Sequence, residues 1–259
     1  MSTVIYPSPI FGPIHSRRLG ISLGVNLMPS DGKICTFDCI YCECGFNEDR
    51  RPKQKRPERA EIATQLESIL VKMSAKQQLP DVITFAGNGE PTAHPDFKSI
   101  IQDTILLRNK YCPNAKVSVL SNSTFADKPS VHEALLLVDN NILKLDTVNQ
   151  HFIEMIDRPL SKSYDVRKVI ETMKSFDGHV IIQTMFLRGN LNGIDIDNTG
   201  DNYVGEWLEA IKYINPQQVM IYTIDRETPN HNLLKALPEQ LDVIRDKVIA
   251  LGIPCTASY

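Results

Sequence analysis

Long apolar runs are missing from this sequence of 259 residues. Apolar stretches such as Ala134–Val138 and Val180–Ile182 fall far short of the roughly 18 residues that a membrane-spanning helix needs. The segment Met1–Pro7 also lacks the basic start and continuous apolar segment of a signal peptide. We therefore expect a cytoplasmic protein without a membrane partner.

A strong charge of one sign is also missing. The net charge is −3, which gives no general attraction to DNA or to anionic membranes. One segment departs from this average, because residues 48–59 carry six basic and three acidic side chains, a local +3. This basic loop is either a solvated surface loop or a binding surface for a phosphate-rich or acidic partner.

Cysteines are too few for a disulfide scaffold, and their distribution is uneven. Four of the six fall within ten residues, and the other two are isolated: Cys35, Cys39, Cys42 and Cys44, then Cys112 and Cys255. In a chain without a secretion signal, clustered cysteines indicate a metal or redox site and not structural disulfides.

Short β-rich runs alternate with segments of helical period. The predicted strands are Ile21–Leu27, Asp81–Ala86, Lys116–Ser121, Asn141–Val148, His179–Leu187, Gln217–Ile224 and Ile253–Ser258. Between them, apolar stripes predict helices that include Ile62–Met73, Val166–Phe176, Val204–Ile211 and Leu241–Leu251, with weaker ones near 96–109 and 129–138.

This alternation is typical of an α/β protein with a parallel sheet and right-handed crossovers. An open doubly wound sheet and an incomplete barrel both fit six such units. Polar or glycine-rich residues follow nearly every strand, and a barrel brings all of these strand ends to one site, so we expect a partial (β/α)6 barrel. No linker divides the chain, so we expect one domain over 1–259, with an N-terminal extension 1–20, a cysteine loop 30–45 and the basic loop 48–59.

The cysteine loop has the spacing C-x3-C-x2-C at Cys35, Cys39 and Cys42. Three thiolates bind three irons of a [4Fe–4S] cluster and leave the fourth iron open, whereas ferredoxin-type clusters take four cysteines. Structural zinc is the alternative, and it needs four ligands. Cys44 would make an unusual pair with Cys42, and no distant C-x2-C is present, so we expect a cluster and treat Cys44 as a neighbouring thiol that is not a ligand.

A second motif, Gly87-Asn88-Gly89-Glu90-Pro91, follows the second predicted strand. Together with the cysteine loop it resembles the radical S-adenosylmethionine (SAM) superfamily. The resemblance implies a radical SAM type of partial barrel, one [4Fe–4S] cluster on the three cysteines, and SAM as the second cofactor. It further implies an oxidoreductase-like cleavage of SAM to a 5′-deoxyadenosyl radical that abstracts hydrogen, and a one-electron donor such as flavodoxin or ferredoxin.

The resemblance also implies cofactor-binding residues. The segment Gly87, Asn88, Gly89, Glu90, Pro91 is expected to bind the amino group of SAM, with Asn88 in place of the usual second glycine, and Tyr41 to lie near the adenine. Strand-end side chains are expected to contact SAM as well: Ser121, Asn122, Asp146 and Gln183. Ordinary turn chemistry, loop packing and a buried polar pair of Gln183 with Thr184 are the alternatives.

The stretch 12–24, with its paired Arg17 and Arg18, and the segment 222–226 resemble a subgroup often labelled wyosine-synthesis-like. Wyosine synthetases act on a guanine of transfer RNA and carry a second cluster on additional N-terminal cysteines, and no cysteine precedes Cys35 here. The substrate is therefore not carried over. RNA, a peptide or protein (including a glycyl-radical partner) and a small molecule remain open, and an iron–sulfur or zinc binding module is the non-enzymatic alternative.

Overall fold

The structure is a computed structural model, and it describes residues 3–16 and 20–259. Its centre is an 8-stranded sheet in the order β1-β2-β3-β4-β5-β6-β9-β11. β1 pairs antiparallel with β2, and the other neighbours in this order are parallel. The strands are β1 (Ile10–Ser16), β2 (Gly20–Val25), β3 (Val82–Phe85), β4 (Lys116–Ser121), β5 (Asn140–Lys144), β6 (Ile181–Met185), β9 (Gln218–Tyr222) and β11 (Cys255–Ser258).

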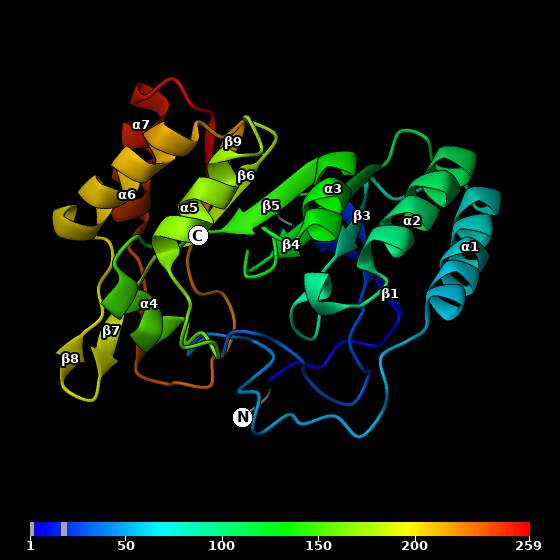
Figure 1. The fold of residues 1–259 in the computed structure, drawn as a ribbon, viewed down its shortest axis with the longest axis horizontal. Coiled ribbons are helices and arrows are strands. Elements are labelled where there is room, and N and C mark those ends of the chain that lie inside the picture. The colour runs from blue at the N-terminus through cyan, green and yellow to red at the C-terminus, as the bar shows by residue number, and fades with distance from the viewer. Residues whose placement is uncertain (1–2, 17–19) are drawn as a thin grey trace.

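The strand order decides between the two architectures that the sequence left open. A doubly wound sheet reverses its order at a switch point, whereas here each parallel strand lies beside the next one along the sheet without reversal. The sheet curves without closing, and most of its helices lie along one side (Figure 1). The expected mixed α/β fold with a partial barrel is therefore confirmed.

Helices connect the strands, and all but a short one after β5 were expected from apolar stripes, which they bury against the outer face of the sheet. They are α1 (Arg59–Ala75), α2 (Phe97–Tyr111), α3 (Pro129–Leu137), α4 (Gln150–Ile156), α5 (Val166–Lys174), α6 (Asp201–Ile214) and α7 (Pro238–Ala250). The α6 helix, for example, buries Val204, Trp207 and Ile211 at 1% exposure or less. None of the helices in the described part of the chain is long and apolar enough to cross a membrane.

Alternation along the strands separates two cores. Outward residues such as Leu143 and Ile182 join the main core under the helices. Inward residues Ile142, Ile181 and Met220 form a small cluster inside the barrel. The rest of the inner face is more polar, as in the 2.8 Å hydrogen bond between Ser22 and Thr84. The barrel interior is therefore apolar only in part.

Several elements differ from the prediction. The expected N-terminal extension contains β1, which Gly12, Pro13 and an irregular register between Phe11 and Ile14 hide from a search for alternation. The expected strand His179–Leu187 is two strands, because the chain leaves the sheet after Met185 and enters a 3-stranded sheet, β10-β7-β8. That small sheet consists of β7 (Leu187–Leu191), β8 (Ile194–Asp195) and β10 (Leu233–Lys235). Arg17 and Arg18 lie outside the described residues.

The long segment between β2 and α1, which holds the cysteine loop, runs along the side away from most helices, in blue to cyan in Figure 1. It follows the carboxyl end of β2. Because the parallel strands run in one direction, their carboxyl ends share the edge of the sheet from which this segment leaves. The strand-end motifs and the cysteine loop are thus brought together.

Candidate active site

The cysteine loop 30–45 has almost no regular structure, and backbone hydrogen bonds hold it on two sides. On one side the loop pairs with the motif after β3. The amide of Ile34 donates to Asn88 O at 3.0 Å, and the amide of Glu90 donates to Ile34 O at 3.0 Å. Gly89 is needed at this contact, because it has φ +128° and a Cβ there would lie 1.9 Å from Ile34 O.

On the other side the loop is held by the end of α4 and the segment that follows it. The amide of Asp38 donates to Asp157 O at 3.0 Å, and the amide of Ile40 donates to Ile156 O at 2.9 Å. The amide of Leu160 donates to Thr36 O at 2.9 Å. Two segments far apart in the sequence therefore fix the backbone that carries the three cysteines.

All six cysteines are free thiols, and Cys35, Cys39 and Cys42 are each partly exposed, whereas Cys44 is buried. The Cys44 thiol donates to Gly87 O at 3.5 Å. Burial raises the pKa of Cys35 to about 12 and that of Cys39 well above its usual value. The pKa of Cys42 falls to about 6, because hydrogen bonding with Cys44 and the positive charge of Lys33 outweigh its burial.

Glu90 is 2% exposed and joins the ends of two strands. Its Oε1 accepts from Thr92 N at 3.1 Å, Thr92 Oγ1 at 2.5 Å and Ser121 Oγ at 2.8 Å. Its Oε2 accepts from Asn122 N at 2.7 Å. Burial raises the pKa of Glu90, although these donors oppose the rise. The carboxylate is therefore a well-connected acceptor whose Oε2 has room for one more donor.

Asn88 is fully buried and points away from the cysteines. Its Oδ1 accepts from Tyr6 N at 2.8 Å, and its Nδ2 donates to Tyr6 O and Pro29 O, both at 2.9 Å. The side chain that replaces the usual glycine therefore anchors the N-terminal segment to the motif. Pro91 begins a short 3-10 helix over Pro91–Ala93, for which Glu90 provides the N-terminal cap.

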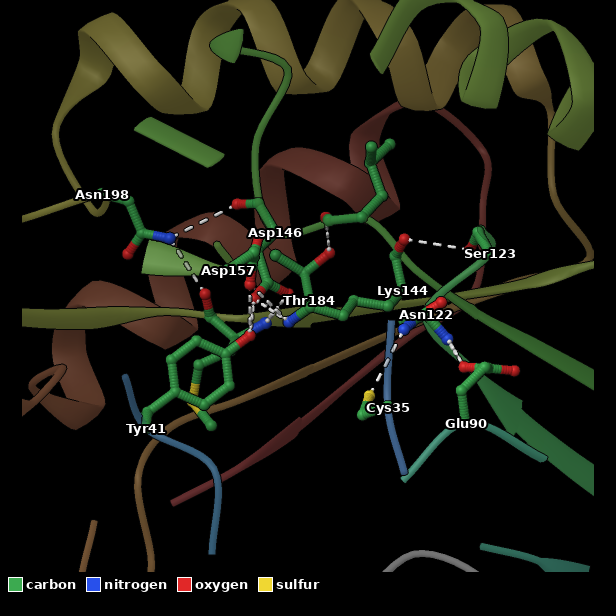
Figure 2. Close-up of polar contacts among 12 residues, drawn as sticks. Cys35, Tyr41, Glu90, Asn122, Ser123, Lys144, Asp146, Asp157, Thr184 and Asn198 are labelled. Atoms are coloured by element: carbon green, nitrogen blue, oxygen red, sulfur yellow. Dashed lines mark hydrogen bonds and ion pairs between the residues drawn. The ribbon is translucent and has the colours of Figure 1, made fainter. Parts of the chain in front are cut away.

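Asn122 and Ser121 end β4 beside the cysteine loop. Asn122 Nδ2 donates to Thr36 Oγ1 at 2.8 Å and lies 3.6 Å from Cys35 Sγ (Figure 2). Gln183 lies on the same face of β6 as Ile181 and Met185, so its side chain is on the inner face. Thr184 is on the opposite face, where its hydroxyl donates to Leu145 O at 2.7 Å. Both side chains are therefore buried, as in the alternative of a buried polar pair, but only Gln183 faces the barrel interior.

Tyr41 and Asp146 belong to a buried polar network on the other side of the loop (Figure 2). The Tyr41 hydroxyl, which has one proton to donate, lies 2.9 Å from Asp157 Oδ1 and within hydrogen-bond distance of Asp146. Lys144 forms ion pairs with Asp146 and, at 3.0 Å, with Asp157, and its Nζ lies 4.5 Å from the centre of the Tyr41 ring. Asp146 Oδ1 accepts from Met185 N at 2.9 Å. In this structure Tyr41 and Asp146 thus bind protein groups.

Burial and neighbouring charges shift the pKa values of two residues in this network. Burial raises the pKa of Asp157 to about 7, although Lys144 opposes the rise. Burial alone would lower the pKa of Lys144, but the carboxylates of Asp146 and Asp157 raise it well above its usual value. Lys144 is therefore a cation next to Cys39.

The donor set fits an iron–sulfur cluster. Three free thiols lie in one loop, and Lys33 is a buried side chain of the same loop. Among the residues that the structure describes, no three His, Cys, Asp or Glu side chains come close enough to share a single metal ion. A four-iron cluster does not require that spacing, because each thiolate binds a different iron.

Fold and site together define an α/β protein with a partial barrel that carries a three-thiol loop at the carboxyl ends of its strands. Residues 30–199 match the Radical SAM superfamily, and the chain belongs to this superfamily of enzymes. The superfamily uses a [4Fe–4S] cluster with three cysteine ligands, together with SAM.

The chain is 32% identical over 221 residues to a UPF0026 protein of Helicobacter pylori strain J99. The aligned region covers 84% of this chain and 66% of that protein. A radical SAM methyltransferase from Sphaerobacter thermophilus superposes with a TM-score of 0.66 at 15% identity, over 92% of this chain and 66% of the other. TYW1 with a bound lysine–pyruvate adduct superposes with a TM-score of 0.61 at 14% identity, over 88% of this chain and 73% of the other. The two solved structures are similar in fold.

Sequence reasoning missed three charged residues of this site: Lys33, Lys144 and Asp157. A lysine inside a predicted strand was the available signal for Lys144, since a buried lysine needs a charged partner. Asp157 gave no such signal, because it follows a short helix that the sequence did not predict.

Proposed function

We propose that Cys35, Cys39 and Cys42 hold the [4Fe–4S] cluster and that SAM binds beside them, between the strand-end residues. Three free thiols in a loop fixed on two sides support this assignment. When bound, the cluster supplies one electron that splits SAM and yields a 5′-deoxyadenosyl radical for hydrogen abstraction.

The chain's own residues position these groups. Glu90 Oε2 accepts a hydrogen bond from the ammonium group of SAM. Ser121 and Asn122 hold the Glu90 carboxylate in place through the hydrogen bonds described above. Gln183 faces the same interior. Tyr41 and Asp146 fix the far side of the cysteine loop, where Tyr41 would lie near the adenine.

We further propose an RNA substrate, and the observation that carries this is the basic loop 48–59. Arg51, Lys53 and Lys55 are exposed and form no ion pair with any residue of the described ranges. The loop contacts the start of the cysteine loop, where the amide of Lys33 donates to Arg50 O at 2.7 Å. Unpaired basic side chains at the edge of a radical site suit a phosphate backbone.

Salt dependence tests the RNA assignment. Each phosphate contact on single-stranded RNA contributes about −0.7 to the slope of log K against log salt, so replacing Arg51, Lys53 and Lys55 by Ala makes the slope less negative by about 2. Replacing Lys72, Lys168 and Lys212, exposed lysines on the outer helices, by Ala is the matched control and leaves the slope unchanged. Equal slopes in both variants refute the basic loop as the RNA surface.

The substrate class is identified from the amount of 5′-deoxyadenosine that each candidate fraction produces. Reconstituted protein is incubated anaerobically with SAM, a one-electron reductant and the RNA, protein or small-molecule fraction of a cell extract. We expect the RNA fraction to raise 5′-deoxyadenosine above the uncoupled background. A rise with the protein fraction alone instead indicates a glycyl-radical-activating or peptide-modifying enzyme.

The ligand assignment has its own test. Replacing Cys35, Cys39 or Cys42 by Ala abolishes 5′-deoxyadenosine formation, while Cys44→Ala retains it, because three thiolates and SAM complete the irons' ligands. Iron and sulfide analysis gives about four of each per chain. About eight of each points to a second cluster, and equal loss in Cys44→Ala shows that the open iron is assigned wrongly.

A further inference from the structure

Lys33 is a charged side chain that the proposed chemistry leaves without a role. The residue is 4% exposed and lies two positions before Cys35. Lysine is almost never fully buried unless it is paired, because the desolvation of its ammonium is costly. Its burial within the cysteine loop therefore needs a reason.

The ammonium group is held among loop groups. Lys33 Nζ donates to Gly45 O at 2.7 Å, and Asp38 Oδ1 lies 3.8 Å away. Gly45 in turn donates its amide to Cys42 O at 2.9 Å, so the ammonium group binds the turn that carries Cys42. A carbonyl and a carboxylate of the cysteine loop thus hold Nζ.

Asp38 does not fully offset the charge of Lys33. The same carboxylate accepts from Asn47 N at 2.7 Å and lies 3.6 Å from Arg158, which is a second cation. Lys144 differs in this respect, since two carboxylates surround it. Positive charge is therefore in excess on the Lys33 side of the loop.

We propose that Lys33 raises the reduction potential of the cluster by holding a buried positive charge within the loop that carries its three cysteines. This inference rests on the proposed ligand set. One-electron reduction adds one negative charge and breaks no bond, so a nearby cation stabilises the reduced cluster more than the oxidised one. Net charge and hydrogen bonds to the sulfurs are the terms that set such potentials.

The test compares Lys33→Met, which removes charge and donor, with Lys33→Gln, which removes only the charge. Lys53→Met is the control, because Lys53 is exposed on the adjoining basic loop. Each protein is reconstituted anaerobically, and its iron content is measured. Its cluster is then reduced stepwise with dithionite while the solution potential is measured, and electron paramagnetic resonance gives the reduced fraction at each potential.

We expect Lys33→Met to lower the equilibrium constant for one-electron reduction at least tenfold, a shift of about 59 mV to more negative potential. Lys33→Gln gives a smaller shift in the same direction, and Lys53→Met gives none. Equal iron content with an unchanged midpoint in Lys33→Met overturns the proposal. If Lys33→Met takes up no iron, Lys33→Arg and Lys33→Gln decide, and equal midpoints for these two overturn it.

The failure of the proposed function looks different. In that case the unaltered protein gives no reducible four-iron signal, or retains one after Cys35, Cys39 and Cys42 are replaced. A normal signal with an unmoved midpoint refutes only the role of Lys33.

Discussion

Replacing Glu90 by Gln changes the most connected side chain of the site while keeping its shape. The carboxylate accepts four hydrogen bonds, three at Oε1 and one at Oε2. The proposed function gives the remaining site on Oε2 to the ammonium of SAM. The substitution removes the negative charge from that contact.

The effect on SAM follows from the strength of this bond. A hydrogen bond between charged groups is worth about 1.5–3 kcal/mol, so SAM affinity falls roughly 10- to 150-fold. The amide also has to turn its NH2 group toward one set of partners. The cost is lowest when the NH2 group faces Thr92 and Ser121, because their hydroxyls can rotate to accept hydrogen bonds from it. In that orientation only the backbone amide of Thr92 loses its acceptor.

One unmet buried donor lowers the free energy of unfolding by about 1–3 kcal/mol. The loss is at the lower end, because burial raises the pKa of Glu90 and the neutral amide avoids that burial cost. The iron content is unchanged, since no contact of Glu90 reaches a cysteine sulfur.

Two measurements check this account. Titrating SAM into the reduced protein and following the electron paramagnetic resonance signal gives the affinity, and urea unfolding gives the stability. Glu67→Gln is the control, because Glu67 accepts from Tyr111 at 2.6 Å and Lys110 at 3.0 Å on the outer helices, far from SAM. An unchanged SAM midpoint in Glu90→Gln would falsify the ammonium contact, and a loss of iron would show that Glu90 acts only by holding the cysteine loop.

Two further predictions concern backbone and acid stability. Gly89→Ala should lose most of its iron, because the new Cβ meets Ile34 O at 1.9 Å, whereas Gly193→Ala, also at positive φ but with open space, keeps it; full iron in Gly89→Ala refutes the contact. Asp139→Asn should lower the free energy of unfolding at pH 7 by about 1 kcal/mol, allowing for partial exposure. Burial opposes the shift, but the Val117 amide and Arg108 hold the folded pKa of Asp139 below its usual value, so the difference disappears as the pH falls through that folded value; a constant gap from pH 7 to 2 contradicts this.

The parallel strands and outer helices were predictable because each obeys a short period. A stripe such as Ile62, Leu66 and Met73 is buried as expected, and β4 occupies Lys116–Ser121 as predicted. The convergence of Glu90 with Asn122 was also predictable, since parallel strands end at one edge. These features depend on local pattern and on topology, which the sequence carries directly.

Partners across long sequence separations were not predictable. Asp157 binds Tyr41 across a sequence separation of 116 residues, and no motif near either residue indicates that the two side chains meet. Tyr41 was assigned only to adenine or loop packing, and its hydroxyl contacts depend on where α4 ends. The small β10-β7-β8 sheet was missed because its strands have at most five residues and begin without a turn signal after β6.

The cysteine loop is made early in synthesis but fixed late. Tyr6 donates to Glu43 at 2.9 Å, and Arg226 donates to Glu43 at 2.7 Å and to Tyr6 at 2.6 Å, so this contact joins residues 220 positions apart. At about 5–20 residues per second, a ribosome needs on the order of 10–40 s after Cys42 to complete Arg226. In the first part of that interval, until Leu160 is made, the three thiols also lack the backbone hydrogen bonds that hold their loop, and they are open to oxidation and to other metals. Iron delivery is therefore expected to follow synthesis of residues 156–160 at the earliest, and a chain truncated before Ile156 should accumulate without iron.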